Sequence, residues 1–97
     1  MRQYVLVSYD IADPKRWRKV YKIMKGYGEH VQFSVFICQL TDLDKAQLKA
    51  KLDDEVHHNE DQVMFVEIGP VTRSQLEKRI TTVGRDYLPR DLTKLIY

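Results

Sequence analysis

The chain has 97 residues, of which 43% are hydrophobic and 31% are charged, so it is long enough for one small globular domain. Its single cysteine, Cys38, excludes an internal disulfide framework, and no apolar run approaches the roughly 18–20 residues of a membrane span. The first residues lack the features of a signal peptide, so we expect a cytoplasmic protein with no membrane partner.

The net charge of +2 conceals an uneven distribution along the chain. Residues 1–28 carry seven basic and two acidic side chains, and residues 68–97 carry six basic and three acidic ones. Residues 29–67, by contrast, carry three basic and nine acidic side chains. Only part of the surface is therefore expected to suit a polyanion.

The first quarter of the chain predicts a strand followed by a helix. Residues 4–10 are rich in β-branched and aromatic side chains, which indicates a buried strand. Asp13 and Pro14 suit the start of a helix, and Gly26 and Gly28 suit its end. Between them, apolar residues recur at helical spacing: Trp17, Val20, Tyr21, Met24 and Tyr27.

Residues 30–40 form one long strand or two short strands folded near Phe33 and Ser34, and periodicity alone does not decide between them. Thr41 and Asp44 have the spacing of a capping box, with Asp in place of the usual Glu. They open a second predicted helix through about Val56, whose apolar positions are Leu43, Ala46, Leu48, Leu52 and Val56.

The remainder of the chain predicts a loop over residues 57–61 and a strand over residues 63–68 that ends at Gly69 and Pro70. A short helix over residues 72–80 and a short strand over residues 81–83 follow. If residues 30–40 are a single strand, the fold is a three-layer parallel arrangement. If they are a hairpin, the element order is βαββαβ, as in the ferredoxin-like fold.

Asp10 is the strongest candidate for a chemical role. It ends the first predicted strand, and strand ends often carry functional sites in α/β sheets. Its carboxylate suits Mg²⁺, which typically takes one or two protein carboxylates and keeps several waters. Aspartate is also a favoured turn residue, although Asp13 is better placed to cap the helix. The residues alone leave both interpretations of Asp10 open.

The first helix is the second candidate, because it holds six basic residues within eleven positions and no acidic one. Four of them share the face opposite the apolar stripe, and such a face suits phosphates. A solvated outer face is the other interpretation, although such faces usually mix charges at i,i+4 spacing. The six residues are Lys15, Arg16, Arg18, Lys19, Lys22 and Lys25, and the four that share a face are Lys15, Arg18, Lys19 and Lys22.

Aromatic residues on a ferredoxin-like sheet are a further candidate, since they can bind RNA. Tyr4, Phe33, Phe36 and Phe65 are available, but the Gly- and aromatic-rich signature of RNA-recognition modules is missing. We therefore expect most of them to pack in the core.

A series of short motifs resembles the Cas-two family, the second core CRISPR-associated protein. The resemblance covers nearly the whole chain, and its most specific part is the Val-Gln-x-Ser-Val-Phe run. In chain order the motifs are Tyr9-Asp10-Ile11, Arg16-x-Arg18-Lys19-Val20, Gly28-x-x-Val31-Gln32-x-Ser34-Val35-Phe36, a strand near residues 63–69, Val83-Gly84 and an apolar Leu95-Ile96-Tyr97 end.

The resemblance implies an α+β, ferredoxin-like βαββαβ fold with an antiparallel sheet, and so favours the hairpin. It also implies a homodimer in which the sheets of two chains face each other. In this interpretation residues 1–97 are one domain, with a core over residues 1–85 and a dimerisation segment over residues 86–97. The apolar side chains of that segment, Leu92, Leu95, Ile96 and Tyr97, need a cover, and its strand would cross to the partner.

The resemblance also implies an activity. The family's metal-binding and catalytic aspartate falls on Asp10, and its basic residues near the site fall on Arg16 and Arg18. Members are described as Mg²⁺-dependent endonucleases on RNA or duplex DNA, and as partners of the CRISPR integrase subunit in spacer acquisition. Many members have Arg directly before Val31, where this chain has His30, whose charge can change near neutral pH.

Three functions are compatible with these observations. The dimer is a nuclease that holds Mg²⁺ between two Asp10 carboxylates, or a non-catalytic scaffold that carries duplex DNA and bridges integrase subunits. The third is a toxin-like ribonuclease of related fold. Asp10→Ala, compared in cleavage and in spacer acquisition, separates the first two.

Overall fold

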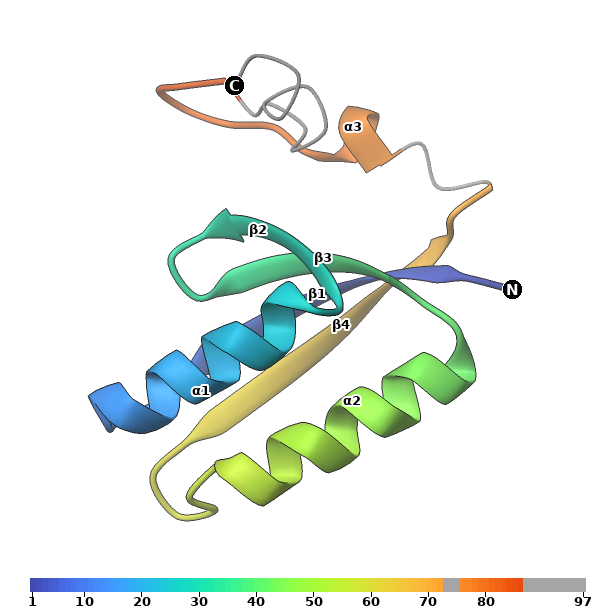
Figure 1. The fold of residues 1–97 in the computed structure, drawn as a ribbon. Coiled ribbons are helices and arrows are strands. Elements are labelled where there is room, and N and C mark those ends of the chain that lie inside the picture. The colour runs from blue at the N-terminus through green and yellow to red at the C-terminus, as the bar shows by residue number, and fades with distance from the viewer. Residues whose placement is uncertain (73–75, 87–97) are drawn as a thin grey trace.

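A four-stranded antiparallel sheet, covered on one face by two helices, forms the fold in the computed structural model, which describes residues 1–72 and 76–86 (Figure 1). The sheet order is β2-β3-β1-β4. This is the ferredoxin-like βαββαβ arrangement that the motifs implied, and the prediction of an α+β fold is confirmed. The elements are β1 (Gln3–Asp10), α1 (Pro14–Lys25), β2 (Gly28–Gln32), β3 (Val35–Leu40), α2 (Asp42–Glu55), β4 (Gln62–Pro70) and α3 (Leu76–Arg79).

Strands β2 and β3 form the hairpin, with Phe33 and Ser34 at its turn, so the three-layer parallel alternative is wrong. The close approach of the two strands explains why Gly28 begins β2. A Cβ atom at this position would lie 2.3 Å from Cys38 Sγ and 2.8 Å from the Ile37 carbonyl oxygen. Only glycine leaves room for β3 at this point.

Both long helices begin at the caps that the sequence predicts. Asp13 caps α1, because its Oδ2 accepts a hydrogen bond of 3.0 Å from the Arg16 backbone N–H. Thr41 and Asp44 form the capping box of α2, in which each side chain accepts from the other residue's backbone N–H. The last helical residues are Lys25 and Glu55, so both boundaries agree with the expected ones.

The core lies between the sheet and the two helices. Alternate residues of β1 and β3 point into it, where they meet the apolar faces of α1 and α2. Its buried members are Val5, Val7, Tyr9, Val20, Met24, Phe36, Cys38, Leu40, Leu48 and Leu52. The prediction that Leu43 and Ala46 belong to the apolar face of α2 is wrong, because Leu43 is 66% exposed and Ala46 is also exposed. With 3.6 residues per turn, both point to the side opposite Leu48 and Leu52.

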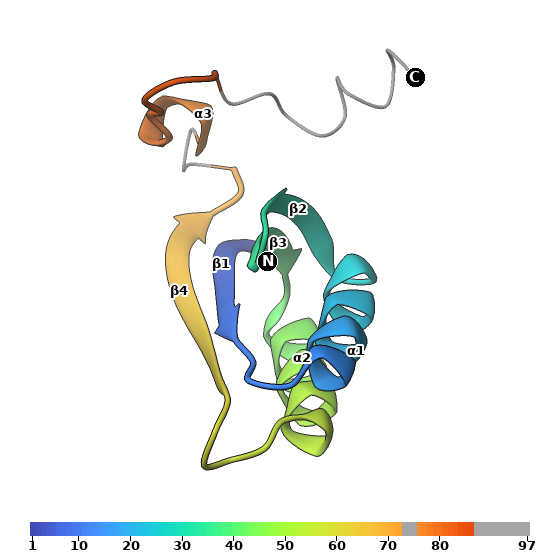
Figure 2. The same ribbon diagram turned by 90° about the vertical axis from the view of Figure 1, so that its left-hand side faces the viewer.

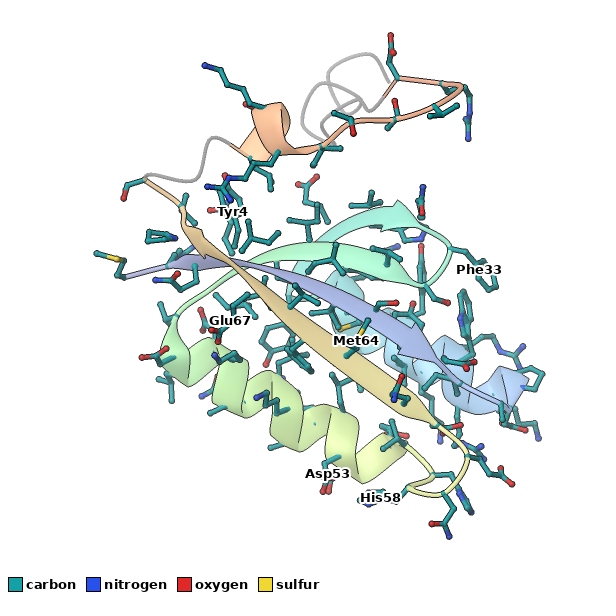
Figure 3. All side chains as sticks on the ribbon, turned by 180° about the vertical axis from the view of Figure 1, so that it is seen from behind. Tyr4, Phe33, Asp53, His58, Met64 and Glu67 are labelled. Atoms are coloured by element: carbon teal, nitrogen blue, oxygen red, sulfur yellow. The ribbon has the colours of Figure 1, made fainter. Side chains whose placement is uncertain are left out.

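The other face of the sheet, which we call the open face, is not covered by α1 or α2 (Figure 2). Strand register places Leu6, Ile37 and Val66 side by side on it, followed by Ser8, Val35 and Met64. Met64 and Val66 are 49% and 43% exposed (Figure 3 labels Met64). The open face therefore presents apolar surface that the long helices of the same chain leave uncovered.

Residues 80–86 lie beside the β2 and β3 part of this face and bound a groove of about 460 Å³. The expected strand over residues 81–83 is wrong, because these residues pair with no strand in the described chain and Val83 is fully exposed. Of the expected helix over residues 72–80, the structure describes Leu76–Arg79 as α3 and leaves residues 73–75 outside. The apolar segment over residues 92–97 also lies outside the described residues.

Candidate functional site

Asp10 is the last residue of β1, and its side chain lies on the open-face side of the sheet. The alternation of β1 sets this direction, because Val5, Val7 and Tyr9 point to the helices. Asp10 is exposed, and although its backbone pairs with Gln62 of β4, its carboxylate makes no hydrogen bond or ion pair with any residue of the described chain. Its carboxylate oxygens are therefore available to a cation or to water.

One chain supplies few ligands for a metal at this point. Among the described residues, no group of three or more His, Cys, Asp or Glu side chains is placed to hold an ion. Carboxylate oxygen is the donor that Mg²⁺ prefers, and Mg²⁺ tolerates a site with few protein ligands because it retains water. The donor set fits Mg²⁺ only if the site is completed by a second carboxylate or by water.

A second aspartate, Asp61, organises the loops around the end of β1. Its side chain is buried and accepts backbone N–H groups from Ala12, at 2.9 Å, and from His57, at 2.8 Å. Arg16 Nε donates to the same carboxylate at 2.8 Å. The Arg16 hydrogen bond is the main cause of a pKa for Asp61 well below its ordinary value, and the two backbone donors add to it. Asp61 thus joins the β1–α1 loop to the α2–β4 loop.

Arg16, predicted as a nucleic-acid contact, is largely engaged within the chain. Its Nη2 donates to Glu60 Oε1 and to Asp61 Oδ1, each at 3.2 Å, in addition to the Nε contact. The sequence reasoning missed Asp61 and Glu60 because they lie about 45 residues from Arg16 in a loop that shows no motif. The only available signal is that α1 carries no acid that could pair with Arg16.

The remaining predicted contacts on α1 form an exposed basic face, which comprises Lys15, Arg18, Lys19 and Lys22. Lys19 Nζ lies 3.9 Å from Glu55 Oε2, a long ion pair between exposed groups. The other three have no ion pair within residues 1–72 and 76–86. The charge of this face is therefore left almost unneutralised by the protein itself.

An aromatic cluster fills the space between α1 and the β2–β3 hairpin. Trp17 stacks on Tyr21, with ring centroids 5.2 Å apart, and on Phe33, with centroids 4.8 Å apart. Trp17 Nε1 donates to Ser34 Oγ at 2.9 Å, which fixes the indole against the turn. His30 packs edge-on against Tyr21, and its Nε2 donates to the Phe33 carbonyl oxygen at 3.2 Å.

Tyr9 belongs to the same cluster but cannot serve as an acid or base near neutral pH. Its hydroxyl group is buried, and no described residue forms a hydrogen bond with it. Burial, with a smaller contribution from Tyr21, raises the Tyr9 pKa to about 12. Tyr9 therefore offers no acid–base group at this end of the sheet near neutral pH.

Fold and site together define a small ferredoxin-like domain with a carboxylate at the end of a strand that no described residue pairs with, next to a helix with an exposed basic face. No helix in the described part of the chain is both long and apolar enough to cross a membrane.

Comparison with known proteins identifies the family. Residues 1–79 match the family "CRISPR associated protein Cas2". A protein of Rhodospirillum rubrum named CRISPR-associated endoribonuclease Cas2 1 is 46% identical over 82 residues, which cover 84% of this chain and 78% of the relative. A CRISPR-associated endoribonuclease Cas2 of Geobacter sulfurreducens is 33% identical over 89 residues, 92% of each chain. This chain therefore belongs to the Cas2 family.

Solved structures agree with this assignment. The crystal structure of Streptococcus pyogenes Cas2 superimposes with a TM-score of 0.74 and 32% sequence identity, and the match covers 84% of this chain and 99% of that one. A Thermus thermophilus protein of known crystal structure, TT1823, gives a TM-score of 0.77 at 26% identity, over 92% of this chain and 99% of that one.

Proposed function

We propose that this protein is a dimeric, metal-dependent endonuclease in which Asp10 of each chain contributes to one shared site. The observation that carries the proposal is the placement of Asp10, an exposed carboxylate without a partner among the described residues, on the same face as Leu6, Met64 and Val66. Packing two open faces together buries those apolar side chains. The same packing brings the two Asp10 carboxylates to one interface.

Asp10 would hold the cation, with Mg²⁺ as the expected ion. When bound, a divalent cation of this kind lowers the pKa of a coordinated water and neutralises charge on a phosphodiester. Asp61 keeps the neighbouring loop in place through Ala12 and Arg16. The basic face of α1 would hold the nucleic-acid backbone, because its side chains are exposed and largely unpaired.

RNA is the first substrate to test, since the curated relatives are named endoribonucleases, and duplex DNA is the second. The test compares wild type, Asp10→Asn and the control Asp54→Asn, an exposed aspartate on α2. We expect Mg²⁺-dependent cleavage in wild type and control, and loss of cleavage with retained binding in Asp10→Asn. Equal cleavage by all three would overturn the proposal.

A second candidate function is a non-catalytic scaffold that carries duplex DNA and bridges CRISPR integrase subunits. The observation that favours it is that the described residues of one chain hold no group of three or more His, Cys, Asp or Glu side chains placed to bind a metal ion. In that case Asp10→Asn leaves DNA binding and spacer acquisition unchanged, whereas loss of the basic face of α1 impairs both. If the protein is instead a nuclease whose cleavage is needed for spacer acquisition, Asp10→Asn impairs acquisition.

A further inference from the structure

Phe33 is unusual among the aromatic residues because it is 75% exposed at the tip of the β2–β3 hairpin. Figure 3 shows its ring at this turn, directed away from the sheet and beside α1. We expected most of the candidate aromatics to pack in the core; Phe36, which is fully buried, does so, and Phe33 is an exception. Most of the surface of this phenyl ring therefore remains open to solvent or to a ligand.

The ring is nonetheless held in a fixed position. It stacks on Trp17 at an interplanar angle of 19°, and Trp17 is itself fixed by the hydrogen bond to Ser34. The His30 imidazole donates to the Phe33 carbonyl oxygen and so supports the turn from the other side. A stacking surface that is ordered before binding costs less conformational entropy when a ligand arrives.

The surroundings of Phe33 suit nucleic acid. The turn is linked to the end of β1, because the Tyr9 backbone N–H donates to the Ser34 carbonyl oxygen at 3.0 Å. Phe33 and Asp10 therefore lie at the same end of the sheet. Arg18 and Lys22 directly follow Trp17 and Tyr21 on α1, so positive charge adjoins the aromatic cluster.

We propose that Phe33 is a stacking site for an unpaired base of single-stranded nucleic acid, whose backbone lies along α1. The free face of the ring takes the base, and the basic face takes the phosphates. Stacking on aromatic side chains accepts any base, because every base has a π-face. This inference rests on the proposed function, since it assumes that nucleic acid binds at α1.

Trp17 offers a direct probe of the site, because it is the only tryptophan in the chain and stacks on Phe33. The full-length protein is titrated with a single-stranded oligouridylate and with a strand of equal length and charge whose central residues are abasic. Affinity is followed by anisotropy of the labelled strand, and contact at the site by Trp17 fluorescence. The variants are Phe33→Leu, which removes the ring, Phe33→Tyr, which keeps it, and Leu43→Ala, an exposed apolar control on α2.

We expect wild type, Phe33→Tyr and Leu43→Ala to bind the normal strand roughly 5- to 150-fold more tightly than the abasic one, the range typical of one stacked base. Phe33→Leu should bind both strands equally, with an unchanged salt dependence, and its Trp17 signal should respond alike to both. Equal binding of the two strands by wild type overturns the stacking site but leaves phosphate binding at α1 intact. No binding of either strand contradicts the proposed function as well. A shift of Phe33→Leu towards monomer in sedimentation would assign the ring to a subunit contact instead.

Discussion

Asp10 and Asp61 flank strands β1 and β4 at neighbouring positions, yet their surroundings give them different properties. Asp10 is exposed and has no partner among the described residues, whereas Asp61 is buried and accepts from Ala12, His57 and Arg16. A carboxylate whose acceptor sites are filled must give up hydrogen bonds before it can bind a cation. Asp10 is therefore the better placed of the two for the proposed metal site, whereas Asp61 anchors the neighbouring loops.

The sequence distinguishes these two aspartates only in part. Asp10 can be recognised because it ends an apolar strand and because the Tyr9-Asp10-Ile11 motif resembles a family signature. Asp61 cannot be recognised in this way, since its partners Arg16 and Ala12 are 45 and 49 residues away in the sequence. Pairing over such a distance is set by tertiary packing and leaves no local pattern.

Asp61→Asn should change the acid stability of the protein. In an unfolded chain the pKa of an aspartate is about 4. In the folded chain the Asp61 pKa is lower, mainly because of the hydrogen bond from Arg16. Its stabilising contribution is therefore fully present above about pH 4 and is lost as the pH falls through the lowered pKa. The difference in unfolding free energy between wild type and variant, measured by urea denaturation, should shrink as the pH falls from 6 to 2. A difference that stays constant over this range argues against the anchor.

Gly28→Ala should destabilise the fold by about 1–3 kcal/mol, the usual cost of overpacking. The added methyl group would meet Cys38 Sγ and the backbone of Ile37, and the backbone cannot move without disturbing β3. Gly26→Ala is the matched control, because its Cβ would approach only the Ile23 carbonyl oxygen, at 3.4 Å. Thermal unfolding of both variants checks this, and equal melting temperatures would show that β2 tolerates the side chain.

At the scale of elements, α1 presents two faces of different character. Val20 and Met24 bury one face against the sheet, and the basic face points outward. Both faces, and the caps of α1 and α2, could be predicted from the sequence because they depend on spacing within one helix. The β2–β3 hairpin could not be predicted from periodicity, since a strand and a hairpin share the same alternation. The resemblance to the Cas2 family is what favoured the hairpin over a single strand.

The basic face of α1 should bind phosphate without regard to base sequence. Single Ala substitutions of Lys15, Arg18 and Lys22 should each weaken binding to a similar extent on different sequences. Each should also flatten the slope of log affinity against log salt, by about 0.9 on duplex DNA or about 0.7 on a single strand. Lys51→Ala, on α2, is the control. A changed sequence preference with an unchanged slope would show that these side chains read bases.

At the scale of the whole molecule, the proposed dimer and its shared site both depend on the open face. Its apolar side chains and Asp10 lie on one side of a sheet whose other side is closed by α1 and α2. Two helices cover only one side of a four-stranded sheet, so the element order alone leads one to expect an uncovered face. The sequence could not predict that residues 80–86 lie beside this face without forming a strand, since that depends on contacts between distant segments.

Val66→Lys should convert a dimer into a monomer, because it places a charge beside Leu6 among the apolar side chains of the open face. Leu43→Lys is the matched control, since Leu43 is exposed on α2 and away from that face. Sedimentation velocity at several protein concentrations should show the control as a dimer and Val66→Lys as a monomer. If both variants remain dimeric, the subunits associate through another surface.

The most direct test of the shared site is the stoichiometry of cation binding. We propose titrating the wild-type protein, Asp10→Asn and Val66→Lys with Mn²⁺, a spectroscopically visible substitute for Mg²⁺, and counting bound ions by electron paramagnetic resonance. A site shared by two Asp10 carboxylates predicts one ion per two wild-type chains, and loss of that ion both in Asp10→Asn and in the monomeric Val66→Lys. One ion per chain, or equal affinity for Mn²⁺ in wild type and Asp10→Asn, would contradict a site shared by two Asp10 carboxylates.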